Sequence, residues 1–233
     1  EIMPSLVGSE MCIRDRASER SVSAPPVYSR ASKAVGGAET DLSDARLVLV
    51  NGNLPLTEEP TPELAVADEA TGVSLEAEAA AAYRQMAEAA RQDGIELVLT
   101  AGHQDAAARQ SAYEAAVQSY REAGSKEEDA AAKAATVQPA PEASEYATGY
   151  AADILAADSL EENTGFADTR AYEWLEAYAA EYGFILRWPQ ERQAATGMVF
   201  EPWHWRYVGR DNALAIRASG LSLEEYLALE QTK

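Results

Sequence analysis

Short apolar runs bounded by turn residues predict the strands of this chain. The run at 47–50 reads Leu-Val-Leu-Val and is followed by Asn-Gly-Asn. Two further runs, at 95–100 and 184–189, each begin directly after a glycine. Branched and aromatic side chains favour extended backbone, whereas glycine and asparagine favour turns. The pattern therefore predicts three short strands separated by longer, more polar segments.

Apolar residues spaced by three and four positions predict helices between these strands. Ser74 is the expected N-cap of a helix that runs to about Asp93. Asp168 is the expected N-cap of a second helix, which reaches Tyr182. The expected core positions of these helices are Leu75, Ala79, Ala82, Tyr83, Met86, Ala90, Trp174 and Leu175.

Two other segments predict shorter helices. Residues 106–135 are rich in alanine, which favours helix, and Gly124-Ser125 should divide them. Near the end of the chain, Ser222 and Glu225 have the spacing of a capping box.

The first 45 residues differ from the rest in composition. Residues 1–16 resemble the translation of a sequencing-library adapter, so we exclude them, and with them the single cysteine, Cys12. Residues 17–45, rich in Ser, Ala, Gly and Pro, predict a disordered linker. The expected folded domain is 46–233. If residues 1–16 are an adapter, the natural N-terminal signal is missing from this chain, and we expect an extracellular or cell-envelope protein that is anchored or secreted.

The charge excludes two classes of partner. Nineteen Lys and Arg residues stand against 39 Asp and Glu residues, a net charge of -20. Nucleic acids and anionic membranes both require a basic face, so neither is expected to bind. We also find no apolar run long enough to predict a transmembrane segment.

The segment 201–209, Glu-Pro-Trp-His-Trp-Arg-Tyr-Val-Gly, carries the first candidate chemistry. It has strong strand propensity and contains one of only two histidines. In a regular strand Glu201 and His204 would face opposite sides, so acting together requires a bend, which Pro202 favours. A glutamate beside a neutral imidazole suits a metal-activated water. The structural alternative is a half-buried strand with a hydrogen-bonded histidine.

This segment resembles the last motif of the zinc D-Ala-D-Ala carboxypeptidases. These cell-wall peptidases include the vancomycin-resistance D,D-carboxypeptidases and share a fold with the Hedgehog signalling domain. The resemblance implies an α+β fold, with a small, largely antiparallel sheet flanked by helices. It also implies that Glu201 is the general base and His204 a zinc ligand.

A second segment, 144–154, resembles the family pattern S-x-H-x-x-G-x-A-x-D, in which the His and the Asp bind zinc. Ser144, Gly149, Ala151 and Asp153 match in register, which implies a ligand role for Asp153 and a substrate contact for Ser144. Tyr146 stands where the family has histidine. A tyrosine binds metal well only as phenolate.

A third segment departs further. The family has S-G-Y-R-S where this chain has Ala101-Gly102-His103-Gln104-Asp105. The family's Arg grips the terminal carboxylate of the substrate, and Gln104 offers only a neutral amide there. Arg109 could substitute, although we expect it to be a solvated helix residue. Arg206 is a further candidate for substrate binding.

A catalytic zinc usually has three protein ligands and a water. Asp153 and His204 are in place, and the third ligand is either Tyr146 or His103. His103 stands where the family has tyrosine, so a reciprocal exchange could rebuild the site if the two positions face each other.

Three hypotheses follow. The first is a zinc carboxypeptidase that removes the terminal D-Ala of peptidoglycan stem peptides. The second is a catalytically impaired or inactive relative that binds the cell wall, because one ligand is Tyr146 and the carboxylate-binding Arg is Gln104. The third is a metal-dependent enzyme whose substrate lacks a free carboxylate.

Overall fold

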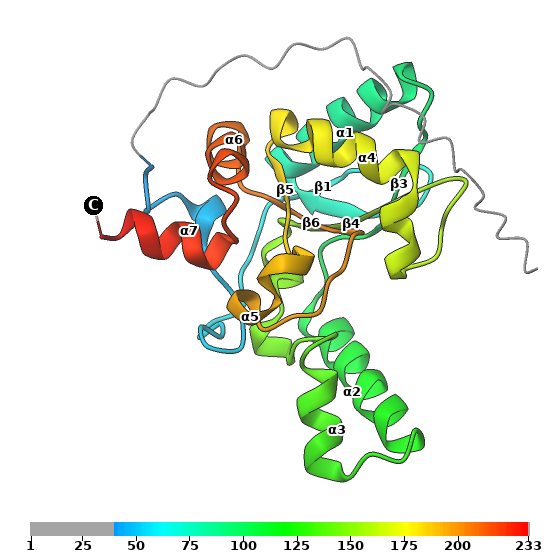
Figure 1. Cartoon of the computed structure of the whole chain (residues 1–233), viewed down its shortest axis with the longest axis vertical. Helices are drawn as coiled ribbons and strands as arrows, with labels where there is room; N and C mark the ends of the chain where they lie inside the picture. The colour runs from blue at the N-terminus through cyan, green and yellow to red at the C-terminus, as the bar shows by residue number, and fades with distance from the viewer. Residues whose placement is uncertain (1–39, 233) are drawn as a thin grey trace, which may run out of the picture. The chain divides into compact units, whose positions relative to one another are not determined.

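The computed structural model describes residues 40–232, and a four-stranded antiparallel sheet lies at its centre. The strand order is β3-β4-β6-β5 (Figure 1). The strands span Leu97–Ala101 (β3), Ala151–Ala156 (β4), Phe184–Leu186 (β5) and His204–Tyr207 (β6). A separate two-stranded sheet pairs β1, Leu64–Val66, with β2, Ser74–Glu76.

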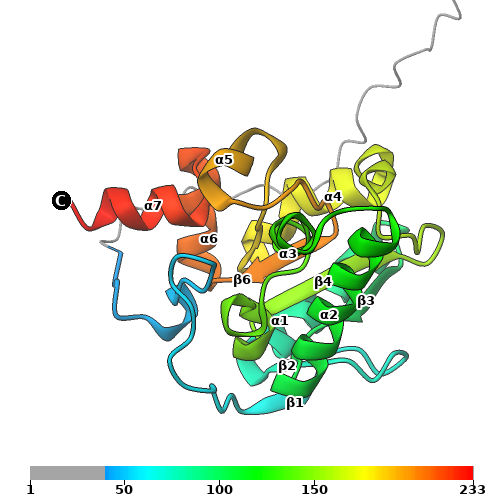
Figure 2. The same cartoon turned by 90° about the horizontal axis from the view of Figure 1, so that it is seen from below.

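Helices surround this sheet. They span Ala77–Gln92 (α1), Ala106–Glu122 (α2), Glu127–Ala134 (α3), Arg170–Tyr178 (α4), Gln193–Thr196 (α5), Arg210–Ser219 (α6) and Leu223–Glu230 (α7). Helices α1 and α4 pack on β3 and β4, and α6 packs on β5. Figures 1 and 2 show α2 and α3 as a hairpin that extends away from the sheet.

The expected fold class is confirmed: small antiparallel sheets are flanked by helices. Several predicted core positions are confirmed: Met86, Trp174 and Leu175 are fully buried on helices, and Leu75 is fully buried on β2. Among the described residues, no helix combines the length and apolarity needed to cross a lipid bilayer.

The strand predicted at 47–50 is wrong. A short 3-10 helix, Ala45–Leu47, occupies its start, and only Asn51 forms an isolated bridge, with Leu54. The reason lies in Arg206, whose Nη2 donates hydrogen bonds to the carbonyls of Arg46 and Val48. A distant side chain therefore takes the acceptors that a neighbouring strand would have used.

Two predicted N-caps are also wrong. Ser74 lies in β2, and α1 is capped by Glu76, whose carboxylate accepts from the backbone amides of Glu78 and Ala79. Helix α4 is capped by Thr169 instead of Asp168, and it gives way to a 3-10 turn after Tyr178. Several adjacent side chains can accept the same amide hydrogens, so local pattern does not select among them.

The other local predictions are confirmed. The alanine-rich region forms two helices, α2 and α3, that separate around Gly124. Ser222 and Glu225 form both hydrogen bonds of the predicted capping box.

The adapter-like residues and most of the expected linker lie outside the described residues. Within the described part, residues of the expected linker contact the folded domain. The hydroxyl of Thr40 lies 2.6 Å from that of Tyr226, and the carboxylate of Asp44 accepts from Asn212.

Candidate functional site

Two neighbouring strands bring the predicted site residues together. In the register of β4 and β6, Asp153 lies directly opposite His204. Strand β6 begins only at His204, and the turn before it is closed by a hydrogen bond from the His204 amide to the Glu201 carbonyl. The bend predicted at Pro202 is therefore present, and it places Glu201 outside the strand, close to His204.

A 3-10 helix, Glu145–Thr148, adds two more side chains to the same place. It ends at Gly149, which adopts a φ of +74°, and a Cβ there would lie 2.9 Å from the backbone nitrogen of Glu76. Only glycine suits this combination of a left-handed conformation and a close approach. The turn thereby directs Tyr146 and Glu145 toward His204.

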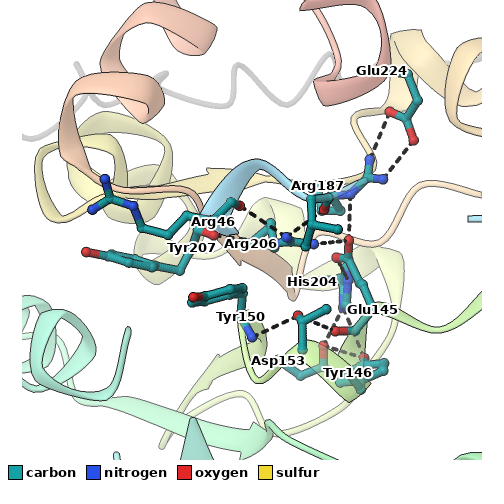
Figure 3. A network of polar contacts seen from close by, with 12 residues as sticks. Arg46, Glu145, Tyr146, Tyr150, Asp153, Arg187, His204, Arg206, Tyr207 and Glu224 are labelled. Atoms are coloured by element: carbon teal, nitrogen blue, oxygen red, sulfur yellow. Dashed lines mark hydrogen bonds and ion pairs between the residues drawn. The ribbon is translucent and has the colours of Figure 1, made fainter. Parts of the chain in front are cut away.

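Tyr146, Asp153 and His204 form a closed, buried cluster (Figure 3). The Tyr146 hydroxyl lies 2.8 Å from Oδ1 and 2.7 Å from Oδ2 of Asp153, and 3.0 Å from Nδ1 of His204. His204 Nδ1 lies 2.7 Å from Asp153 Oδ1. All three polar groups are therefore hydrogen-bonded to one another.

The other side of His204 meets a buried ion network. Nε2 of His204 lies 2.9 Å from Glu145 Oε1, while Glu145 Oε2 accepts from Arg187 Nε and Arg206 Nη1, at 3.0 and 2.8 Å. Arg187 also forms a bidentate pair with Glu224, at 2.7 and 2.9 Å (Figure 3). Each carboxylate and each guanidinium thus has an oppositely charged partner, as buried charges require.

Trp188 completes the shell around the imidazole. Its ring stacks on His204 with centroids 3.9 Å apart and an angle of 11° between the planes. An aromatic face over a protonated imidazole adds cation–π attraction to the packing. The ring of His204 is consequently held on both edges and one face.

The contacts determine the protonation of this cluster. Burial by itself lowers the pKa of His204, but the hydrogen bonds to Asp153 and Glu145 outweigh it and raise that pKa to about 9. A carboxylate at each ring nitrogen requires two N–H donors, which only the imidazolium has. Burial, and then the charge of Asp153, raise the pKa of the Tyr146 phenol well above its usual value, so the phenol is neutral.

Glu201 lies next to this cluster, at the edge of a pocket. The pocket has a volume of about 880 Å³ and is lined by Glu162, Phe200, Glu201 and Trp203, among others. Burial raises the pKa of Glu201; although His204 opposes the shift, the charges of Asp153 and Glu162 add to it, and the pKa reaches about 8. The carboxyl of Glu201 is therefore largely protonated at neutral pH.

The predicted third metal ligand is only partly supported. Tyr146 reaches both Asp153 and His204, as the ligand position requires, but as a neutral phenol. Burial, and then the charge of Arg109, lower the pKa of His103, and the carboxylates that oppose this shift are those of Asp105 and Glu59. The reciprocal exchange of roles between His103 and Tyr146 stays a prediction.

The expected zinc does not fit the residues as they stand. Within residues 40–232, no three His, Cys, Asp or Glu side chains are grouped so that they could hold a metal ion. Both nitrogens of His204 already contact carboxylates, and the oxygen of Tyr146 occupies the space between Asp153 and His204.

The predicted arginines have different positions from those expected. Arg109 is not solvated: it is 2% exposed, its Nη atoms pair with the Glu59 carboxylate, and its guanidinium also binds the carbonyls of Gln104 and Pro141. Arg206 is fully buried and donates to Glu145 and to backbone carbonyls. Because it is buried and its donors are used within the protein, Arg206 does not suit the predicted contact with substrate.

Two predicted substrate contacts carry unpaired polar atoms. Among the described residues, the buried Ser144 Oγ and Gln104 Oε1 have no hydrogen-bond partner. Both are adjacent to the Tyr146 turn, since Ser144 precedes it and the Gln104 amide donates to the Tyr146 carbonyl at 3.2 Å. Unpaired buried polar atoms are uncommon and indicate a missing partner.

Sequence reasoning missed Glu145, Arg187, Trp188 and Glu224. Glu145 lies within the second motif, between Ser144 and Tyr146, which we had both singled out, so its charge at that place was an available signal. Arg187 and Trp188 sat in a predicted strand, where a buried arginine is rarely expected. Glu224 had no signal beyond its place in the first turn of a helix.

Comparisons of the sequence with known proteins identify a family. The sequence model of a family described as "VanY: D-alanyl-D-alanine carboxypeptidase" matches residues 72–210. A D-alanyl-D-alanine carboxypeptidase of Enterococcus faecalis is 32% identical over 82% of this chain and 69% of its own length. A putative carboxypeptidase of Bacillus subtilis, YodJ, is 35% identical over 64% of this chain and 52% of its own.

Solved structures give the same answer. VanYB in complex with D-alanine-D-alanine superposes with a TM-score of 0.71 at 31% identity, covering 78% of this chain and 97% of that one. The LdcB LD-carboxypeptidase, a structure concerned with peptidoglycan recognition, has a TM-score of 0.69 at 32% identity over 84% and 92%. A variant of the D,D-pentapeptidase VanY was solved with Zn(II) and has a TM-score of 0.70 at 31% identity over 78% and 98%. On this evidence the chain belongs to the D-alanyl-D-alanine carboxypeptidase family.

Proposed function

We propose that this protein binds the D-alanyl-D-alanine end of peptidoglycan stem peptides in the pocket beside Glu201. One observation carries the proposal: β4, β6 and the turn before β6 bring Asp153, His204 and Glu201 together, and Glu201 lines a pocket of about 880 Å³. Relatives with this fold carry carboxypeptidase names, and one was solved with D-alanine-D-alanine. Because peptidoglycan is part of the cell envelope, we propose that this protein acts there.

Two polar groups adjacent to the Tyr146 turn also suit a short peptide. Ser144 Oγ and Gln104 Oε1 lack partners in the part of the chain that the structure describes, and the amides of a bound peptide could supply them. Gln104 also carries two amide hydrogens that can reach a carboxylate, with less strength than an arginine. We therefore assign Ser144 and Gln104 as the substrate contacts, in place of Arg206.

Hydrolysis of the same peptide is the activity for which the family is described, and we propose it as the step that follows binding. The observation that supports it is the place of Glu201, a buried carboxyl next to Asp153 and His204 that can act as the general base once it is ionised. Zinc hydrolysis by this site requires the Tyr146 hydroxyl to leave the space between those two residues.

One experiment separates the two candidates. The full chain is titrated with a synthetic stem pentapeptide that ends in D-Ala-D-Ala, and heat of binding and release of D-Ala are measured with and without added zinc. A pentapeptide ending in L-Ala-L-Ala is the control. Stereospecific binding without release supports the first proposal, and release that the Glu201→Gln variant loses supports the second. Equal binding of both peptides, or of neither, contradicts the proposed substrate class.

A further inference from the structure

We propose that the hydroxyl of Tyr146 has taken the place of the metal ion, so that this site is complete without metal. The inference concerns the chain's own residues and does not depend on which peptide the pocket holds. It begins from the directions of three atoms: Oδ1 and Oδ2 of Asp153 and Nδ1 of His204 all lie within 3.0 Å of one phenol oxygen. These atoms converge on one point, and Tyr146 fills it.

The separation of the would-be ligands is the second argument. Asp153 Oδ1 and His204 Nδ1 are 2.7 Å apart, which is a hydrogen-bond distance. Two ligands of a tetrahedral zinc with bonds of about 2.0–2.1 Å lie about 3.3 Å from each other. The two side chains are therefore in direct contact, and an ion would have to push them apart as well as displace the phenol.

The contacts of the two ring nitrogens give the third argument. Nδ1 of His204 lies 2.7 Å from Asp153 Oδ1, and Nε2 lies 2.9 Å from Glu145 Oε1. An ion could bind either nitrogen only after one of these contacts is broken.

Tyrosine is suited to this exchange. Its neutral hydroxyl can donate to the Asp153 carboxylate and still accept from the Nδ1–H of His204, so it satisfies both groups at once. Its ring also packs edge-on against the imidazole, with centroids 5.2 Å apart. A phenylalanine there would leave Asp153 with one donor fewer, and a histidine would offer a nitrogen ligand.

The test is the zinc content of the full chain and of two variants after exposure to zinc and dialysis against metal-free buffer. We expect the wild type to retain less than about 0.1 zinc per chain, with an unfolding temperature that neither zinc nor a chelator shifts. Tyr146→His should retain about one zinc per chain and should be stabilised by zinc. Tyr146→Phe is the matched control and should gain no zinc.

Two results would overturn the proposal. One is a wild-type chain that retains about one zinc, or that develops tyrosinate absorption when zinc is added at neutral pH. The other is a folded Tyr146→His variant, judged by circular dichroism, that retains no more zinc than the wild type. If that variant does not fold, the zinc titration and the chelator test of the wild type decide the question alone.

Discussion

The two sides of the Tyr146 turn differ in how well their polar groups are satisfied. On the side of Glu145, every charged group of the network with Arg187, Arg206 and Glu224 has a partner at 3.0 Å or less. On the other side, Ser144 Oγ and Gln104 Oε1 are buried and unpaired within the described residues. The polar groups of the first region are fully hydrogen-bonded, whereas two polar atoms of the second region have no partner. The contrast indicates that stability and binding are separable here.

The largest effect on stability should come from a substitution in the fully paired ion network around Glu145. Arg187→Leu removes a buried cation, which leaves Glu224 without its charged partner and Glu145 with one partner fewer. We therefore expect a loss of about 3–5 kcal/mol in the free energy of unfolding. Denaturant unfolding measures it. Arg91→Ala is the matched control, because Arg91 pairs with Glu88 on the surface, and its removal should change little. Similar losses in both variants would show that the network is not a stabilising unit.

The next effect is a dependence of stability on pH. The folded pKa of His204, about 9, exceeds its unfolded value of 6.5, so its contribution is fully present below pH 6.5 and is lost as pH rises to 9. The shift corresponds to about 3 kcal/mol. The raised pKa of Glu201 acts with the same sign between pH 4.5 and 8.

Unfolding free energies of the wild type and of Glu201→Gln, measured from pH 5 to 10, separate the two contributions. The His204 part should persist in the variant. A stability that stays flat or rises between pH 6.5 and 9 would show that His204 is not held as imidazolium.

A smaller effect on stability should come from removing the hydroxyl of Tyr146, which lies between the two regions. Tyr146→Phe keeps the ring and removes the hydrogen bonds to Asp153 and His204, so it should cost about 1.5–3 kcal/mol. Thermal unfolding measures the change. Tyr113→Phe, on the partly buried face of the α2–α3 hairpin, is a suitable control. An unchanged stability in Tyr146→Phe would mean that the hydroxyl is not part of the cluster.

The smallest effect on stability should come from removing the unpaired hydroxyl of Ser144. Ser144→Ala removes a hydroxyl that has no partner, so the free energy of unfolding should stay the same or rise slightly, while binding of the D-Ala-D-Ala pentapeptide should weaken. Ser222→Ala removes the capping hydroxyl of α7 and should do the opposite, with a loss of about 1 kcal/mol and unchanged binding. If both variants lose stability and neither loses binding, Ser144 belongs to the scaffold.

Some features of this protein followed from the sequence alone. The family resemblance implied that Asp153 and His204 would share one site, and the register of β4 and β6 places them opposite each other. The bend at Pro202, the capping box of Ser222 and the two alanine-rich helices also follow from local rules, because turn geometry, capping and helix propensity depend on neighbours within a few residues.

Only the tertiary structure decided the rest. The carbonyls of Arg46 and Val48 accept hydrogen bonds from Arg206, and the guanidinium of Arg109 pairs with Glu59. Local sequence could not predict these contacts, because each joins residues that are distant along the chain. The sequence showed that Tyr146 replaces a histidine, but the meaning of that change depended on three-dimensional positions. A phenol that lies within hydrogen-bond distance of both remaining ligand positions replaces the metal itself, and no spacing along the chain can specify those distances.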